Sequence, residues 1–182
     1  MILQTLVVLA CVAASAPAAH AQQAEPAPAL RAELPAGQTI GAGRLKFWGL
    51  DVYDALLWAE PGFRHGDFAS QPFVLELSYL RAFAARDIAR RSLEEIGRVN
   101  ALEPAKAVQW QAALARAFPD VKRGDRIAGI HRPGVGVTFL TNGKETGEIR
   151  SAEFARLFFG IWLGPGTSEP GLRQALIGKS PP

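Results

Sequence analysis

The chain has 182 residues, a length that fits one domain. It carries 20 Lys and Arg against 17 Asp and Glu, and a net charge of +3 is too small to predict a nucleic-acid-binding protein. The single cysteine, Cys11, lies near the amino terminus, so the sequence predicts no disulfide and no thiol chemistry in the rest of the chain.

Residues 1–21 have the pattern of a secretory signal peptide, an apolar run followed by small residues that end in Ala19-His20-Ala21. We expect cleavage after Ala21 and a periplasmic or secreted protein. The alternative is a lipoprotein signal with Cys11 as the acylated residue, but only ten residues precede that cysteine. Residues 22–38 are rich in Ala and Pro and are predicted to form a flexible leader, with the domain over residues 39–180.

Residues 43–60 are largely apolar and aromatic, which predicts two strands or one long bent strand with Gly49 as a turn or bulge. Neither side of this segment is cleanly polar, which indicates a central position covered on both faces. The preceding "GAGRLK" has two glycines spaced as in a dinucleotide-binding loop. It lacks the third glycine and precedes a strand, so no nucleotide site is expected.

Residues 72–83 are predicted to form a strand. One of its faces carries Phe73, Leu75, Leu77, Tyr79 and Arg81. An apolar face that ends in a phenol and a guanidinium is compatible with the mouth of a cavity and also with a strand that reaches solvent.

Helices are predicted over 84–100 and 103–119. We expect the second to bury Val108, Gln111, Leu114 or Ala115, and Phe118. The arginines of residues 86–98 admit two interpretations, contact with an anionic lipid surface or a solvated helix face. The interleaved Asp87, Glu94 and Glu95 favour the solvated face.

Residues 123–149 return to strand patterns, with a tight turn predicted at Asn142-Gly143. Ser151 is expected to cap a helix that follows it, and Ser168 to open a short last helix. Strands, two helices, strands and two helices follow one another without regular βαβ alternation. This order predicts the α+β class, an antiparallel sheet with a layer of helices packed on one face.

Motifs for metal, nucleotide or nucleophile chemistry are absent from the sequence, so we expect no metal and no cofactor. Asp125 and His131 share a face of one predicted strand, but about 20 Å of extended chain separates them, too far for an acid–base pair.

Four segments resemble the chalcone isomerase-like family, specifically its bacterial secreted members. They are "GAGRLKFWGLDVYDALLWA" (41–59), "LELSYLRAF" with "ARRSLEEIGR" (75–98), "FPDVKRGDRIAGIHRPGVGVTFLTNG" (118–143) and "FARLFFGIWLG" (154–164). They follow the family's order across nearly the whole chain after residue 38. The resemblance implies an open-faced sandwich with a ligand cleft between the sheet and the helices.

Within this resemblance, plant-type chalcone isomerases use Thr, Tyr and Asn groups that this chain lacks at the matching positions. Trp48 stands where the catalytic Thr is expected, and an indole N–H cannot replace a hydroxyl. The helix from residue 84 offers no Tyr, and no Asn before Asn100. Arg44 lies near the family's arginine, with Leu45 in the slot itself. Chalcone isomerase activity is therefore not expected.

Other branches of the family bind fatty acids through an arginine and a tyrosine, and this implies a carboxylate-binding role for Arg44, Tyr53, Tyr79 and Arg81. For both tyrosines the commoner alternative, a core position with the hydroxyl at an edge, is favoured, whereas Arg81 can equally be surface charge. Asp51 and Asp54 are expected to pair with Arg44 or Arg81 as structural ion pairs.

The sequence thus favours an exported, non-catalytic protein that binds a small amphipathic ligand such as a fatty acid. Two alternatives stay open, an isomerase or lyase acting on another enone, and a periplasmic protein that binds a partner without any small ligand. Nothing in the sequence predicts the oligomeric state.

Overall fold

The computed structural model describes residues 27–178, and the predicted signal peptide lies outside them. The strands are β1 (Gln38–Phe47), β2 (Leu50–Ala59), β3 (Phe73–Tyr79), β4 (Arg126–Arg132), β5 (Gly136–Thr141) and β6 (Lys144–Ile149). The α-helices are α1 (Pro28–Glu33), α2 (Ala85–Val99), α3 (Pro104–Ala117), α4 (Ala152–Leu163) and α5 (Pro170–Ile177). A 3₁₀ segment, η1 (His65–Ser70), joins β2 to β3.

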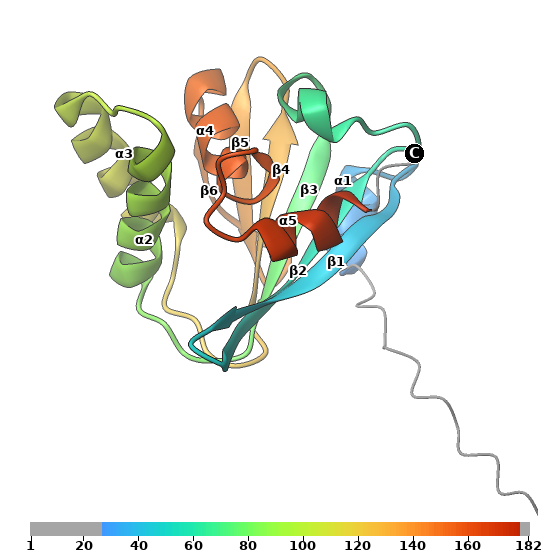
Figure 1. Ribbon diagram of the computed structural model, residues 1–182, viewed down its shortest axis with the longest axis horizontal. Helices are drawn as coiled ribbons and strands as arrows, with labels where there is room; N and C mark the ends of the chain where they lie inside the picture. The colour runs from blue at the N-terminus through green and yellow to red at the C-terminus, as the bar shows by residue number, and fades with distance from the viewer. Residues whose placement is uncertain (1–26, 179–182) are drawn as a thin grey trace, which may run out of the picture.

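The strands form one antiparallel sheet in the order β1-β2-β3-β4-β5-β6, so each strand pairs with its neighbours along the chain. The helices α2 and α3 are inserted between the paired strands β3 and β4. Figure 1 shows α2, α3, α4 and α5 on one side of this sheet. The predicted α+β class, an antiparallel sheet with helices packed on one face, is confirmed.

A tight turn at Trp48-Gly49 joins β1 to β2. Of the two arrangements predicted for this segment, two strands is therefore the one observed. The φ angles of this turn, 50° at Trp48 and 78° at Gly49, nearly equal the 50° and 80° of the predicted turn at Asn142-Gly143. Both residues of each turn are left-handed, the conformation that favours Asn-Gly in two-residue hairpins. A bulky residue pays about 1–2 kcal/mol for that conformation, so Trp48 is an unfavourable choice for the turn.

The predicted leader is not loose throughout, because helix α1 lies within residues 22–38. Pro28 starts the helix, and Leu30 is 1% exposed. Leu30 packs against apolar residues on the sheet face opposite the helical layer, among them Leu56, Val74 and Ile130. The composition predicted a leader because Ala and Pro dominate it, but Leu30 and the neighbouring Leu34 are enough to dock the helix, and the Trp58 indole donates to the Leu34 backbone oxygen at 3.1 Å.

The faces of the later helices were predicted with mixed success. Ser151 caps α4, since its hydroxyl accepts a hydrogen bond from the Phe154 amide at 3.1 Å. The buried face of α3 was predicted correctly at Leu114 and Phe118, which are 0% and 4% exposed, but wrongly at Val108, which is 73% exposed. The helix is instead anchored by Trp110, whose ring contacts Phe154 with centroids 5.2 Å apart. Glu169, not Ser168, is the capping position of α5, and it makes no side-chain cap bond.

The glycines of "GAGRLK" allow helix α5 to lie directly on strand β1. A Cβ atom at Gly41 would lie 2.3 Å from the carbonyl oxygens of Ala175 and Leu176. One at Gly43 would lie 2.8 Å from the Cβ of Ala175. The glycine spacing that resembles a nucleotide loop is therefore a packing requirement between a strand and a helix.

His131 is buried in the sheet, far from any acid–base pairing with Asp125 at the other end of β4. Its ring stacks on Phe73 with centroids 4.8 Å apart, and its Nδ1 lies 2.8 Å from the backbone oxygen of Gln71. Burial is the main cause that lowers the pKa of this imidazole below its usual value of 6.5.

We expect the stability of the protein to fall as the pH drops below about 6.5, because the unfolded chain then binds a proton that folded His131 resists. Chemical unfolding followed by circular dichroism between about pH 7 and pH 5 measures this slope. The variant His131→Gln should lose that part of the pH dependence. An identical slope in both proteins would contradict the assignment.

Candidate ligand-binding cavity

A cavity of about 480 Å³ lies between the sheet and helices α2, α4 and α5. Its wall is drawn from strands β1 to β5 and these three helices, from Leu45 to Leu172. The sheet supplies alternate residues because successive side chains of a strand point to opposite faces. Leu75, Leu77 and Tyr79 of β3 therefore line it together, as the alternation predicted.

The interior of the cavity is apolar. Its buried wall includes Leu75, Ile127, Phe139, Phe158 and Phe159. Gly129 lies in the same wall and leaves room for a ring, since a Cβ atom there would lie 3.1 Å from Phe159. Such a surface suits the hydrocarbon part of a ligand.

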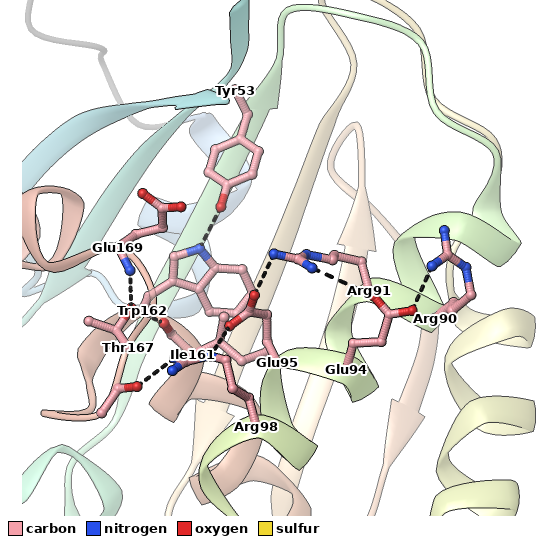
Figure 2. Close-up of polar contacts among 11 residues, drawn as sticks. Tyr53, Arg90, Arg91, Glu94, Glu95, Arg98, Ile161, Trp162, Thr167 and Glu169 are labelled. Atoms are coloured by element: carbon pink, nitrogen blue, oxygen red, sulfur yellow. Dashed lines mark hydrogen bonds and ion pairs between the residues drawn. The ribbon is translucent and has the colours of Figure 1, made fainter. Parts of the chain in front are cut away.

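The two tyrosines of the chain meet on this wall. Tyr53 of β2 is directly opposite Tyr79 of β3, and their rings contact edge-on with centroids 6.0 Å apart. The Trp162 indole of α4 donates to the Tyr53 hydroxyl at 2.9 Å (Figure 2). That bond uses the phenol as an acceptor, so the Tyr53 proton stays free to be donated.

Both phenols keep their protons at neutral pH. Burial is the largest cause that raises the pKa of Tyr53, and the hydrogen bond from Trp162 opposes it. Burial also raises the pKa of Tyr79, which is 4% exposed. The Tyr79 hydroxyl has no hydrogen-bond partner among residues 27–178. Two neutral donors therefore lie side by side on a largely apolar wall.

Arg81 is exposed and lines the same cavity two residues beyond Tyr79. Within residues 27–178 it forms no ion pair. The other lining arginines differ in this respect: Arg90 contacts Glu94 at 2.6 Å, and Arg91 contacts Glu95 at 2.6 Å. In the described part of the chain, Arg81 is thus the cavity's guanidinium without a carboxylate partner.

A polar cluster forms the other side of the cavity, where α2 faces α4. Glu95 is 8% exposed and is held between Arg91 at 2.6 Å and Arg98 at 3.1 Å (Figure 2). Arg98 also donates to the backbone oxygen of Gly166 at 2.5 Å. Glu95 thus holds Arg98 in place, and Arg98 joins α2 to the segment after α4.

Arg44 lies outside the cavity wall, and Leu45 takes the lining position next to it. The Arg44 guanidinium contacts Asp54 at 2.6 Å and Asp51 at 2.9 Å. The expected pairing of both aspartates with an arginine is therefore confirmed. The hydrogen bond and charge of Asp54 are the main causes that raise the pKa of Arg44. Of the four predicted binding residues, the structure brings three together: Tyr53, Tyr79 and Arg81.

Sequence reasoning missed the polar role of Trp162, which was predicted to be a core residue. It is 7% exposed and lies in an apolar stripe, so periodicity alone describes it correctly as core. It also missed that Arg91 and Glu95 line the cavity. Their i,i+4 spacing on a helix predicts the ion pair. The sequence does not show that α2 packs over the sheet with this pair facing the cavity.

Within residues 27–178 there is no group of His, Asp or Glu side chains that could hold a metal ion. No helix in that part of the chain is both long and apolar enough to cross a membrane.

The structure is an antiparallel sheet whose helical layer encloses an apolar cavity with a few polar donors, the kind of concave site in which proteins bind small molecules. The chain belongs to the chalcone isomerase-like family, whose profile matches residues 38–178. A Haemophilus influenzae protein described as uncharacterized is 26% identical over 143 residues, which are 79% of this chain and 69% of that protein.

A fatty-acid binding protein of Arabidopsis thaliana is a structural neighbour. Its crystal structure matches with a TM-score of 0.60 at 13% identity, over 78% of this chain and 87% of that chain. At this identity the likeness establishes the shared fold. The family resemblance expected from the sequence is confirmed.

Proposed function

We propose that this protein binds a single-chain amphipathic carboxylate, such as a fatty acid, without transforming it. The observation that carries the proposal is that Arg81 and Tyr79 line the same apolar cavity while, within residues 27–178, Arg81 forms no ion pair and the Tyr79 hydroxyl forms no hydrogen bond. A guanidinium forks onto a carboxylate, and a phenol adds a further donor. The hydrocarbon chain then occupies the space lined by leucines and phenylalanines.

The size of the cavity supports this ligand class. Small-molecule sites in proteins have volumes of about 300–1,000 Å³, and 480 Å³ lies in that range. The structural neighbour, named as a fatty-acid binding protein, supports the same ligand class. The amino-terminal sequence supports export, with residues 1–21 as a cleaved signal and a periplasmic or secreted protein as the product.

The class of ligand can be determined by identifying the molecule that the protein retains through purification. The full chain is expressed and exported in a bacterial host, purified without detergent and extracted with organic solvent, and the extract is analysed by mass spectrometry. A fatty acid at a stoichiometric level supports the proposal. If no lipid is extracted and the protein fails to bind added fatty acid, it does not have this function. Conversion of an added chalcone, followed by absorbance, would instead support the enzyme alternative.

We expect Arg81→Gln to weaken fatty-acid binding by about 10- to 100-fold, because a hydrogen bond to a charged group contributes about 1.5–3 kcal/mol. Tyr79→Phe should weaken it by about tenfold or less, since the phenol is neutral. Calorimetric titration with a fatty acid and with the fatty alcohol of equal length measures both effects. Arg81→Gln should also abolish the preference for the acid.

Arg86→Gln is the matched control. Arg86 is exposed, lies five residues from Arg81 and does not line the cavity. Its loss removes the same charge from the same end of the molecule. If Arg86→Gln weakens binding as much as Arg81→Gln does, the effect is long-range charge, and Arg81 is not a ligand contact.

A further inference from the structure

The tip of the β1–β2 hairpin carries exposed apolar side chains. In the described residues six large hydrophobic side chains are exposed, and three of them lie within this turn: Phe47 at 53%, Trp48 at 90% and Leu50 at 53%. The rings of Phe47 and Trp48 stack in water, with centroids 5.7 Å apart and planes 15° apart. A contiguous exposed apolar patch of this kind marks an interaction site.

The turn itself does not call for a tryptophan. The chain places Asn142 before Gly143 in a turn with almost the same φ angles, and Asn accommodates the left-handed conformation better than Trp. Trp48 also makes no contribution to the core, since it is almost fully exposed. Neither the turn nor the core therefore explains a tryptophan at position 48. The exposed indole surface itself is the feature to explain.

Basic residues lie at the same end of the sheet as the tip. Figure 1 shows the β1–β2 turn, the β3–α2 loop, the α3–β4 loop and the β5–β6 turn along one edge of the fold. These segments carry exposed basic residues that form no ion pair within residues 27–178, namely Arg81, Arg86, Lys122, Arg123 and Lys144.

The acidic residues of these segments are Asp120, Asp125 and Glu145, and two of them accept hydrogen bonds from backbone amides. Asp120 accepts from the Ala85 amide at 2.8 Å, and Asp125 accepts from the Lys122 amide at 2.8 Å. Glu145, next to Lys144, is exposed. The five basic residues outnumber these three carboxylates, so the edge as a whole has a net positive charge.

The tip also borders the mouth of the cavity. Phe47 and Leu50 line it while remaining half exposed, and Arg81 lines it from the neighbouring loop. A surface that covers the tip would therefore lie against the opening through which a ligand enters.

We propose that the hairpin tip, residues 47–50, docks on an anionic lipid bilayer. Trp48 enters the interface between headgroups and acyl chains, where Trp is favoured. The basic residues at this end of the sheet contact the lipid phosphates, each contributing attraction to a negatively charged leaflet. The mouth of the cavity then faces the membrane, so that the membrane supplies or receives the amphipathic ligand. This goes beyond the proposed function, and docking itself requires no ligand in the cavity.

The test is flotation of the purified, lipid-stripped protein with vesicles of phosphatidylglycerol and phosphatidylethanolamine, and with vesicles of phosphatidylcholine alone. We expect binding to the anionic vesicles that weakens as salt is added. Trp48→Asn should reduce the partition coefficient by about tenfold or more. Because Asn suits the turn, this variant should fold at least as well as the parent, as judged by its melting temperature.

Val108→Gln serves as the control, since it removes an exposed apolar side chain, 73% exposed, from α3 rather than from the tip. Its partition should equal that of the parent. The fluorescence of Trp48 gives a second readout, a blue shift on adding anionic vesicles that is missing in Trp48→Asn.

Equal flotation of the parent and Trp48→Asn would overturn the proposal, as would the absence of any vesicle binding. A dimer in sedimentation equilibrium that Trp48→Asn dissociates, without vesicle binding, would assign the tip to a second copy of the chain and overturn it as well. Titration with a monomeric fatty acid in solution tests the cavity separately, and Trp48→Asn should leave that affinity unchanged because Trp48 does not line the cavity.

Discussion

Replacing Phe159 with alanine is expected to lower the free energy of unfolding by about 3–5 kcal/mol, the usual result of emptying a buried phenylalanine site. The ring is fully buried and contacts Phe73 with centroids 4.7 Å apart, Phe158 at 5.3 Å and His131 at 5.4 Å. Because it also lines the ligand cavity, its loss joins the cavity to a new void in the core. Urea unfolding followed by circular dichroism measures the change.

Phe47→Ala is the control for this prediction, since the same truncation at a half-exposed ring should cost about 1 kcal/mol or less. A second check uses Gly129, where an added Cβ would lie 3.1 Å from the Phe159 ring. Gly129→Ala should destabilise the parent and be better tolerated when Phe159 is alanine. Independent, additive effects of the two changes would show that the ring does not sit against Gly129.

Gly41→Val is expected to destabilise the protein by about 3 kcal/mol, at the upper end of ordinary overpacking. The new side chain would meet the backbone of α5 at Ala175 and Leu176, which cannot turn aside as a side chain can. The helix should move away from β1 and carry Leu172 out of the cavity wall, so ligand affinity should fall as well. Thermal melting and calorimetric titration measure the two effects.

Gly171→Ala is the control, because it tests whether replacing any glycine in this region lowers the stability of the protein. Gly171 lies in α5 itself, and a Cβ atom there meets nothing within 4 Å. This variant should be neutral or slightly stabilising, because Ala is the better helix former. A melting temperature for Gly41→Val equal to the parent's would mean that α5 does not rest on β1 as described.

Much of the fold could be predicted from local patterns. Asn142-Gly143 identified its turn because both residues favour the left-handed conformation, and Ser151 identified a helix start because its hydroxyl can bond to an amide of the first turn. The turn at Trp48-Gly49 was left ambiguous because Trp gives no such signal. The prediction for α3 was right at Leu114 and wrong at Val108, because Trp110, rather than Val108, fills the buried face one turn earlier.

The candidate site was predictable only in part. Period-two alternation along β3 placed Tyr79 and Arg81 on one face, and the cavity lies there. Arg44 was carried into the candidate set by family position alone. One step of alternation decides that Leu45 lines the cavity and Arg44 does not, and the sequence left that step open. The bond between Trp162 and Tyr53 joins residues 109 positions apart, a separation that no local pattern reports.

The cavity wall runs from Leu45 in the first strand to Leu172 in the last helix, so it exists only when strands β1 to β5 and helices α2, α4 and α5 are assembled. Occupancy and folding are therefore linked by mass action. A molecule that fills this space binds the native state and not the unfolded chain, and at a hundred times its Kd it adds about 2.7 kcal/mol to the free energy of unfolding. The melting temperature of the protein is in this sense a report on whether its cavity is full.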